Sequence, residues 1–168
     1  PTHDGARWVE ATIRSVLAQT FADFEVVVSD DRSRDGTIDV IATDHAPHAT
    51  QEKQQDFTEA PFGIVGLETA LPLTLALIDE GVLTLEQVVQ KLTSAPAAAF
   101  GLKKGTLAVG ADADVAIVDP NESWQVDPAK FKSKSRNTPF AGWKVKGRVK
   151  TTIVGGRVVY EAPPAERA

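Results

Sequence analysis

The chain has 168 residues, a formal net charge of −5 at pH 7, 42% hydrophobic residues and no cysteine. This is the composition of a globular protein with one or two small domains, and its mild acidity excludes the basic surface of a nucleic-acid binder. The missing cysteines exclude disulfides, thiolate zinc ligands and a cysteine nucleophile, and they make the cytoplasm the expected compartment. No apolar run reaches the about 20 residues of a membrane helix, so we expect neither nucleic acid nor membrane as partner.

Two elements are predicted before residue 30. Four apolar residues recur at helical spacing within residues 6–19: Val9, Ile13, Val16 and Leu17. Residues 25–29 then form a β-branched apolar run that predicts a buried strand. The preceding residues 1–5 are polar, so we expect no signal peptide there and a longer parent sequence.

A polar turn over residues 30–36 separates this strand from a second strand-like run, residues 38–42. Parallel neighbours need a crossover of about a dozen residues, so the two strands are antiparallel or belong to separate sheets. A long polar loop follows over residues 45–61. Loops of this length are usually functional or disordered.

Three helices are predicted in succession between residues 66 and 101. The first covers residues 66–79, and Pro72 is expected to bend it. Thr84 and Gln87 form a capping box before the second, and Pro96 suits the first turn of a short third helix. In a complete barrel these helices would pack against the barrel wall, which this chain lacks. We therefore predict self-association through their exposed apolar faces.

A small β module is predicted from residue 105 onward. Its apolar runs cover residues 114–118, 143–145, 150–154 and 157–160, and a two-residue Gly155-Gly156 hairpin joins the last two. Trp124 and Trp143 are expected to cover the module's core. Seven branched residues are expected to form that core: Val115, Ile117, Val118, Ile153, Val154, Val158 and Val159.

The motif with the clearest chemistry is Thr43-Asp44-His45-Ala46-Pro47-His48, at the end of the second strand. A carboxylate and imidazoles at a strand exit suit metal binding or acid–base work, although polar strand ends also serve as turn caps. A second acidic pair, Asp112 and Asp114, stands before an apolar strand and is better explained as a turn than as a cation site.

The run from Asp39 to His48 resembles the last barrel strand of a zinc-dependent dihydroorotase, and Pro61-Phe62-Gly63 follows at that family's interval. The resemblance begins at about Asp35 and continues through the first helix, residues 104–119 and residues 137–160. It implies a reversible cyclisation of N-carbamoyl-aspartate to dihydroorotate, in pyrimidine biosynthesis, on a barrel with paired zinc ions.

The resemblance also implies roles for single residues. Asp44 would be metal ligand and proton shuttle, His48 would contact the substrate, and the main chain at Phe62 and Gly63 would hydrogen-bond its ring. The alternative for Phe62 and Gly63 is a simple turn.

Most of the family's metal ligands are missing from the sequence. The family has a His-x-His pair, a carboxylated lysine and two further histidines, whereas this chain has only His3, His45 and His48. Zinc generally takes four ligands, so we expect the isolated chain to bind no zinc and to be inactive unless a partner chain supplies the missing barrel.

The first three dozen residues resemble an inverting family 2 glycosyltransferase, through residues 8–21 and 24–31. In that family an acidic residue at the position of Asp31 helps to hold the nucleotide of a sugar donor. Two alternative functions follow: a glycosyltransferase-derived nucleotide-sugar binder, and a catalytically silent fusion of two enzyme fragments joined at Asp35-Gly36-Thr37.

The expected fold class is α/β, a fragment of a TIM-barrel amidohydrolase with a small β module, preceded by a Rossmann-like helix-strand piece. The expected division is a glycosyltransferase-like fragment at 1–37, a dihydroorotase-like strand, loop and helices at 38–104, a β module at 105–161 and a tail at 162–168.

Overall fold

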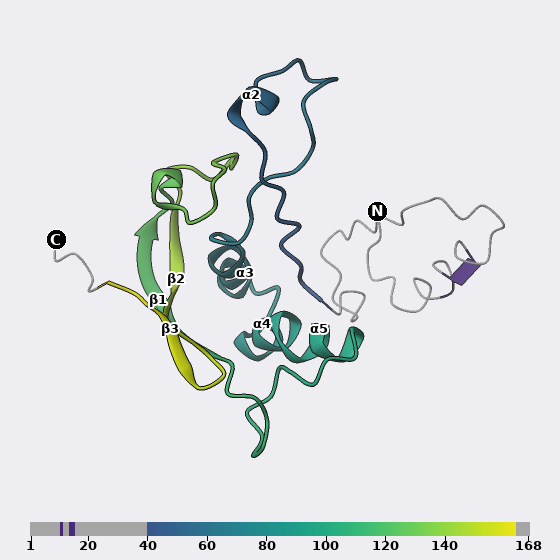
Figure 1. The fold of residues 1–168 in the computed structure, drawn as a ribbon, viewed down its shortest axis with the longest axis vertical. Helices are drawn as coiled ribbons and strands as arrows, with labels where there is room; N and C mark the ends of the chain where they lie inside the picture. Colours follow the sequence, from purple (N-terminus) through teal and green to yellow (C-terminus); the bar gives the residue numbers. More distant parts are fainter. Residues whose placement is uncertain (1–10, 12–13, 16–39, 164–168) are drawn as a thin grey trace. The chain divides into compact units, whose positions relative to one another are not determined.

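The computed structural model describes residues 11, 14–15 and 40–163 (Figure 1). The chain divides into two compact units, Pro1–Ile41 and Ala42–Ala168. In the first unit residues 11, 14 and 15 are helical, within the range predicted for a helix. The expected strand at 25–29, the Rossmann-like piece, Asp31 and the junction at Asp35-Gly36-Thr37 lie outside the described residues. The four-part division of the chain remains a prediction.

The expectation of a strand ending at Ala42 is wrong for its described part. Residues 40–44 have no regular secondary structure, and His45 makes a single parallel bridge to Ile64. A strand persists only where neighbours satisfy its backbone groups. Among the described residues this segment has one such neighbour, over one bridge.

The polar loop over residues 45–61 holds one short helix that the sequence did not predict, α2 (Thr50–Lys53). The side chain of Glu52 accepts a hydrogen bond from the N–H of Ala49 at 2.7 Å, which closes the first turn. α2 therefore shortens the stretch of irregular chain between the motif at Asp44 and the turn at Phe62.

The three predicted helices are present as α3 (Ala70–Asp79), α4 (Leu85–Leu92) and α5 (Ser94–Ala99). α3 begins four residues later than predicted because Gly66 forms a turn with Thr69 and Ala70. Pro72 consequently lies in the first turn, where its missing N–H costs no hydrogen bond and gives no reason for a bend. The capping box of Thr84 and Gln87 is confirmed.

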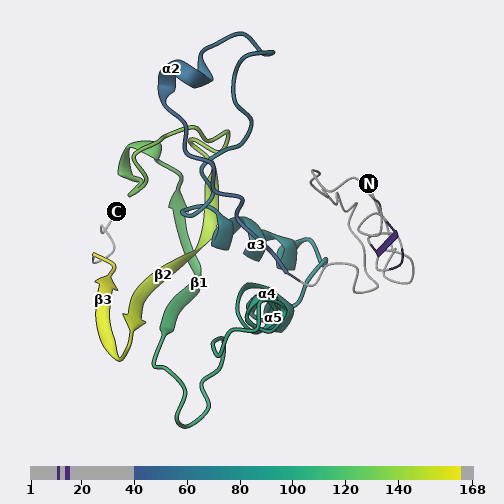
Figure 2. The ribbon, with the colours of Figure 1, turned by 45° about the vertical axis from the view of Figure 1, so that its right-hand side comes forward.

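The β module is a three-stranded antiparallel sheet in the order β1 (Val115–Gln125), β2 (Lys144–Val154) and β3 (Arg157–Glu161) (Figure 2). The predicted runs at 143–145 and 150–154 belong to one strand, β2. The register of β1 on β2 shifts between Asp119 and Ser123, around a proline that cannot donate to a ladder. The Gly155-Gly156 turn joins β2 to β3, with both glycines at positive φ.

The core lies at the other end of the sheet from the one predicted. Val65, Val126 and Phe131 are buried together, with Trp124, Phe140 and Val145 packed against them. The residues expected to form the core are largely exposed: Ile117, Val154, Val158 and Val159 keep 49–61% of their surface. Helix α3 packs on β2, and within the described residues no element covers β3.

The two tryptophans of the β module differ in burial. The indole of Trp124 packs on the core and donates a hydrogen bond to the carbonyl of Gly147 at 2.9 Å. Trp143 remains 53% exposed and meets Phe140 edge to face, with ring centroids 5.1 Å apart. The expectation of core packing therefore holds for Trp124 alone. None of the described helices has the length and apolar character needed to cross a membrane.

Candidate functional site

Two chain segments that the sequence singled out lie side by side, the motif at Asp44–His48 and the turn at Pro61–Ile64. The N–H of Ala46 donates to the carbonyl of Ile64 at 2.9 Å, next to the parallel bridge between His45 and Ile64. The Nε2 of His48 donates to the carbonyl of Phe62 at 2.8 Å. The fold thus brings His48, Phe62 and Gly63 together, and their roles in substrate binding remain predictions.

The hydrogen bond to Phe62 fixes the chemistry of the His48 ring. A carbonyl oxygen only accepts, so Nε2 carries the proton and Nδ1 of the neutral ring keeps a lone pair. Nδ1 lies 3.9 Å from a carboxylate oxygen of Glu52, and the side chain is 24% exposed. His48 can therefore accept a hydrogen bond from a ligand through Nδ1, or form an ion pair when the ring is protonated.

His45 has a structural role in this fold. Its Nδ1 accepts hydrogen bonds from the N–H groups of Gly66 at 3.1 Å and Leu67 at 3.4 Å. These N–H groups precede α3 and would otherwise lack partners, so the imidazole ties the motif to the entry of that helix.

Asp44 has an exposed side chain on a strained backbone. Its φ is +43°, and it is the one non-glycine at positive φ among the described residues. A left-handed conformation costs a non-glycine residue about 1–2 kcal/mol, and such strain concentrates at functional sites. The positive φ breaks the extended conformation of the chain at Asp44, and the carboxylate of Asp44 is exposed to solvent.

The turn at Phe62 and Gly63 requires a glycine. Gly63 has φ +94°, and a Cβ added there would overlap the Cβ of Ala46. The Phe62 ring is 88% exposed, so the turn contributes its main chain to the site. The carbonyl of Gly63 accepts from the Lys53 ammonium at 3.2 Å, and the carbonyl of Phe62 accepts from His48.

Those hydrogen bonds limit what the turn can offer to a ligand. Both carbonyls of the turn accept hydrogen bonds within the protein, so its N–H groups are the main-chain groups left to consider. In the described part of the chain neither N–H donates to another residue. The turn therefore offers two main-chain N–H groups as hydrogen-bond donors.

The described residues do not supply a zinc site. No group of three or more His, Cys, Asp or Glu side chains among them is arranged to hold a metal ion. Nδ1 of His45 accepts from main-chain N–H groups and Nε2 of His48 donates to a main-chain carbonyl, which leaves at most the Asp44 carboxylate and Nδ1 of His48 as donors in this motif. A catalytic zinc needs three protein ligands, so the donor set does not fit one within the described residues.

The acidic pair Asp112 and Asp114 is neutralised by a lysine rather than arranged around an open cation site. Nζ of Lys104 lies 2.6 Å from a carboxylate oxygen of each. The pKa of Lys104 is raised, chiefly by the hydrogen bond to Asp112. The pKa of Asp114 is lowered, chiefly by Lys104 and then by the N–H of Gly155, so the pair anchors a turn, as predicted.

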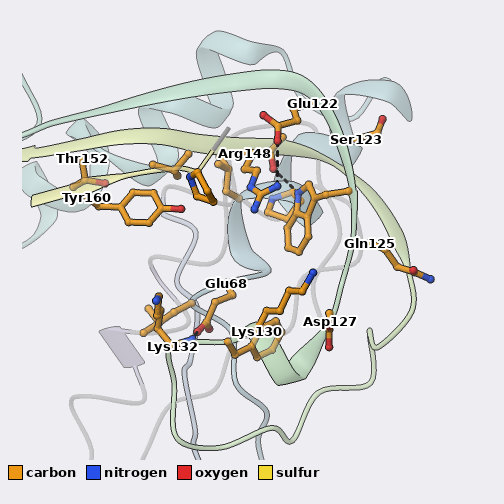
Figure 3. A pocket seen from close by; sticks show the side chains of 18 residues that line it. Glu68, Glu122, Ser123, Gln125, Asp127, Lys130, Lys132, Arg148, Thr152 and Tyr160 are labelled. Atoms are coloured by element: carbon orange, nitrogen blue, oxygen red, sulfur yellow. Dashed lines mark hydrogen bonds and ion pairs between the residues drawn. The ribbon is translucent and has the colours of Figure 1, made fainter. Parts of the chain in front are cut away.

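An open groove of about 900 Å³ lies over the sheet and the start of α3, apart from the predicted site residues (Figure 3). Glu122 and Arg148 form an ion pair at 3.1 Å on one side, and Glu68 lies on the other with Lys130 and Lys132. One oxygen of Glu68 accepts from the N–H groups of Lys132 and Ser133, while the other is buried without a partner among the described residues.

Sequence reasoning missed Lys53 and Asn137, which both hold the turn at Gly63. Lys53 donates to the carbonyls of Pro61 and Gly63, and Asn137 bridges both segments of the site. Asn137 begins the Asn-Thr-Pro-Phe motif that carried part of the resemblance. Only contacts across 74 or more residues identify its role.

Comparisons with known proteins identify relatives of this chain. A family model described as the amidohydrolase family matches residues 18–159. The dihydroorotase of Geobacter sp. (strain M21) is 57% identical over 128 residues, 76% of this chain and 30% of that protein. The dihydroorotase of Geobacter metallireducens is 53% identical over 160 residues, 95% of this chain and 38% of that protein. The chain therefore spans about a third of the length of these relatives.

Hydantoinases are among the solved structures that this chain resembles. The chain superposes on the L-hydantoinase (dihydropyrimidinase) of Arthrobacter aurescens with a TM-score of 0.70 and 39% identity, over 75% of this chain and 29% of that one. The D-hydantoinase (dihydropyrimidinase) of Thermus sp. gives 0.69 and 31%, over the same shares.

The glycosyltransferase resemblance gains no support from these comparisons. The family match already begins at residue 18, inside the segment assigned to that resemblance, and one dihydroorotase aligns with 95% of the chain. The match continues through both segments of the candidate site and through the sheet. The chain belongs to the amidohydrolase family.

Proposed function

We propose that the chain carries the substrate-recognition and proton-transfer part of a dihydroorotase site, whose substrates are dihydroorotate and N-carbamoyl-aspartate. The observation that carries the proposal is the hydrogen bond between His48 and the Phe62–Gly63 turn, which places an acceptor nitrogen beside main-chain donors. The identities of 53–57% to dihydroorotases, against 31–39% to the two hydantoinases, favour dihydroorotate over a hydantoin.

Dihydroorotate complements these groups. It is a cyclic amide with ring N–H donors, ring carbonyls and one carboxylate. His48 Nδ1 accepts from a ring N–H or, when protonated, pairs with the carboxylate, and the N–H groups of Phe62 and Gly63 donate to a ring carbonyl.

Asp44 is assigned the proton transfer. In hydrolysis the oxygen of water bonds to the ring amide carbon, the carbon–nitrogen bond breaks, and the ring nitrogen takes a proton. An exposed carboxylate at the edge of the site can accept the proton from water and deliver it to that nitrogen. Because the described residues provide no zinc site, we expect turnover only with a partner that supplies the remaining barrel.

Calorimetric titration of the full chain with dihydroorotate tests recognition. His48→Ala should weaken binding about tenfold or more, because a hydrogen bond to a charged or polar ligand group is lost. His3→Ala, in a segment outside the described residues, is the matched control and should bind like the unchanged chain. Absence of binding by the unchanged chain contradicts the recognition role.

Hydrolysis of dihydroorotate tests catalysis. The chain should be inactive alone and active when mixed, with zinc present, with the complementary segment of the Geobacter metallireducens dihydroorotase. Asp44→Ala should abolish that activity.

Hydantoin and a nucleotide sugar serve as competing ligands in the binding experiment. Tighter binding of hydantoin than of dihydroorotate would indicate a hydantoinase. Nucleotide-sugar binding that is lost in Asp31→Ala would support the glycosyltransferase alternative.

A further inference from the structure

We propose that Asn137 is a positioning residue that holds the two substrate-facing segments at a fixed separation and so orients His48. This inference rests on the proposed function, because it assigns a role within the same site. Asn137 lies 89 residues from His48 in sequence, and it touches both segments through one amide group.

Asn137 makes three side-chain hydrogen bonds across the site. Its Nδ2 donates to the carbonyl of Ala46 at 2.9 Å and to the carbonyl of Gly63 at 3.3 Å. Its Oδ1 accepts from the N–H of His48 at 3.3 Å. The amide is partly buried, and it contacts the residues on either side of the His48–Phe62 hydrogen bond.

The segment that carries Asn137 is itself anchored at both ends. The main-chain carbonyl of Asn137 accepts from the N–H of Val65 at 3.0 Å. At the other end, Glu68 accepts from the N–H groups of Lys132 and Ser133 at 2.8 and 3.0 Å. Phe131, just before them, is buried in the core with Val65. The backbone that carries the Asn137 side chain is therefore held in place by these contacts.

Only a carboxamide satisfies these partners. Ala46 and Gly63 present carbonyl oxygens, which require a donor, whereas the His48 N–H requires an acceptor. A carboxylate of the same shape accepts but cannot donate when ionised, and an apolar side chain does neither. The requirement explains why an asparagine stands at this position.

His48 depends on this clamp, whereas His45 does not. The main-chain N–H of His48 is hydrogen-bonded to Asn137, and its ring is hydrogen-bonded to the carbonyl of Phe62. His45 is held by Gly66 and Leu67 instead. Loss of the carboxamide should therefore free the His48 ring while His45 keeps its tautomer.

Nuclear magnetic resonance of the full chain with isotope-labelled histidine tests this. The spectra are recorded at a pH at which the imidazole rings are neutral. In the unchanged chain His48 should be the Nε2–H tautomer. Asn137→Ala should convert His48 to a mixture of tautomers, leave the His45 ring signals in place, and weaken dihydroorotate binding about tenfold. Asn137→Asp should act in the same way, and it keeps the side-chain volume if the alanine variant fails to fold.

Asn121→Ala is the matched control, since this exposed asparagine lies on β1 and should change neither ring. Unchanged His48 signals in both Asn137 variants would overturn the proposal, and so would a joint change at His45 and His48, which would indicate general loss of structure. If the unchanged chain binds no dihydroorotate, the proposed function fails, and the tautomer of His48 still decides the role of Asn137.

Discussion

At the residue scale, Asp44 joins an exposed carboxylate to a left-handed backbone. A side chain here has to tolerate φ +43°, and aspartate does so better than residues without a short polar side chain. The strained backbone therefore belongs to the residue that we propose for proton transfer. This is the pattern expected where the surrounding contacts, here those of His45 and Ala46, over-determine the backbone.

The strain at Asp44 makes a prediction about stability. Asp44→Gly should be more stable than Asp44→Ala by about 1 kcal/mol, because glycine adopts positive φ without steric cost. The free energy of unfolding of both variants in urea measures the difference.

The same pair of changes at Asp56 is the control, because Asp56 is not at positive φ. There alanine should be the more stable by about 0.4–1 kcal/mol, since it has fewer unfolded conformations. If the alanine variant were more stable than the glycine variant at both positions, Asp44 would not be strained.

At the scale of elements, the contact of α3 with β2 depends on Gly147. A Cβ at this position would overlap Cδ1 of Leu75, a buried residue of α3, and the φ of Gly147 is +98°. On the same residue the carbonyl accepts from the Trp124 indole. The helix, the strand and the core tryptophan therefore meet at one glycine.

Gly147→Ala should destabilise the chain by about 2–5 kcal/mol, the sum of overpacking against Leu75 and of positive φ. Chemical denaturation measures the loss. Gly81→Ala separates the two terms, because Gly81 has φ +69° and open space at its Cβ. A loss at Gly147 no larger than at Gly81 would contradict close packing of α3 on β2.

Glu122 links β1 to β2 through charge. It accepts from Lys150 at 2.6 Å and from Arg148 at 3.1 Å. These contacts lower the pKa of Glu122 below its ordinary value of 4.5, with the hydrogen bond from Lys150 as the largest cause. A lowered folded pKa contributes stability that is present above the unfolded pKa and is lost as the pH falls through the folded value.

Glu122→Gln should therefore be less stable than the unchanged chain at pH 7, and the difference should close as the pH falls below 4.5. Thermal melts between pH 3 and 7 measure it, about the range over which carboxylates titrate. Glu59→Gln, at an exposed position in the loop after α2, is the matched control for the removal of one carboxylate.

At the scale of the whole molecule, little apolar surface is buried. Among the described residues six hydrophobic side chains are buried: Val65, Leu75, Val88, Ala97, Val126 and Phe131. Phe57, Phe62, Phe100 and Leu107 keep 76–90% of their surface. Surfaces of this kind favour association.

We expect the full chain to self-associate with rising concentration. Light scattering coupled to size-exclusion chromatography measures the mass, and Phe100→Ser with Leu107→Ser should lower it, because both residues are exposed. The matched control is Thr58→Ser, a conservative change at an exposed loop residue. A monodisperse monomer with a sharp cooperative melt would contradict this expectation.

Local signals identified most helices and turns. The Thr84–Gln87 capping box, the position of Pro96 in a first turn and the Gly155-Gly156 hairpin each involve neighbours in sequence, and each is confirmed. The strand expected before Asp44 and the core expected from Val158 and Val159 are wrong. Both depend on which other segments cover them, and that is a long-range property.

The sequence by itself determined the family, the local elements and the candidate residues Asp44, His48, Phe62 and Gly63, because motifs and capping patterns are written in adjacent residues. Only the tertiary structure decided that His45 is structural, that His48 keeps its Nδ1 lone pair, and that Asn137 joins the two segments. The physical reason is that a hydrogen bond is set by distance and direction in space, which residues 74 to 91 positions apart acquire only through folding.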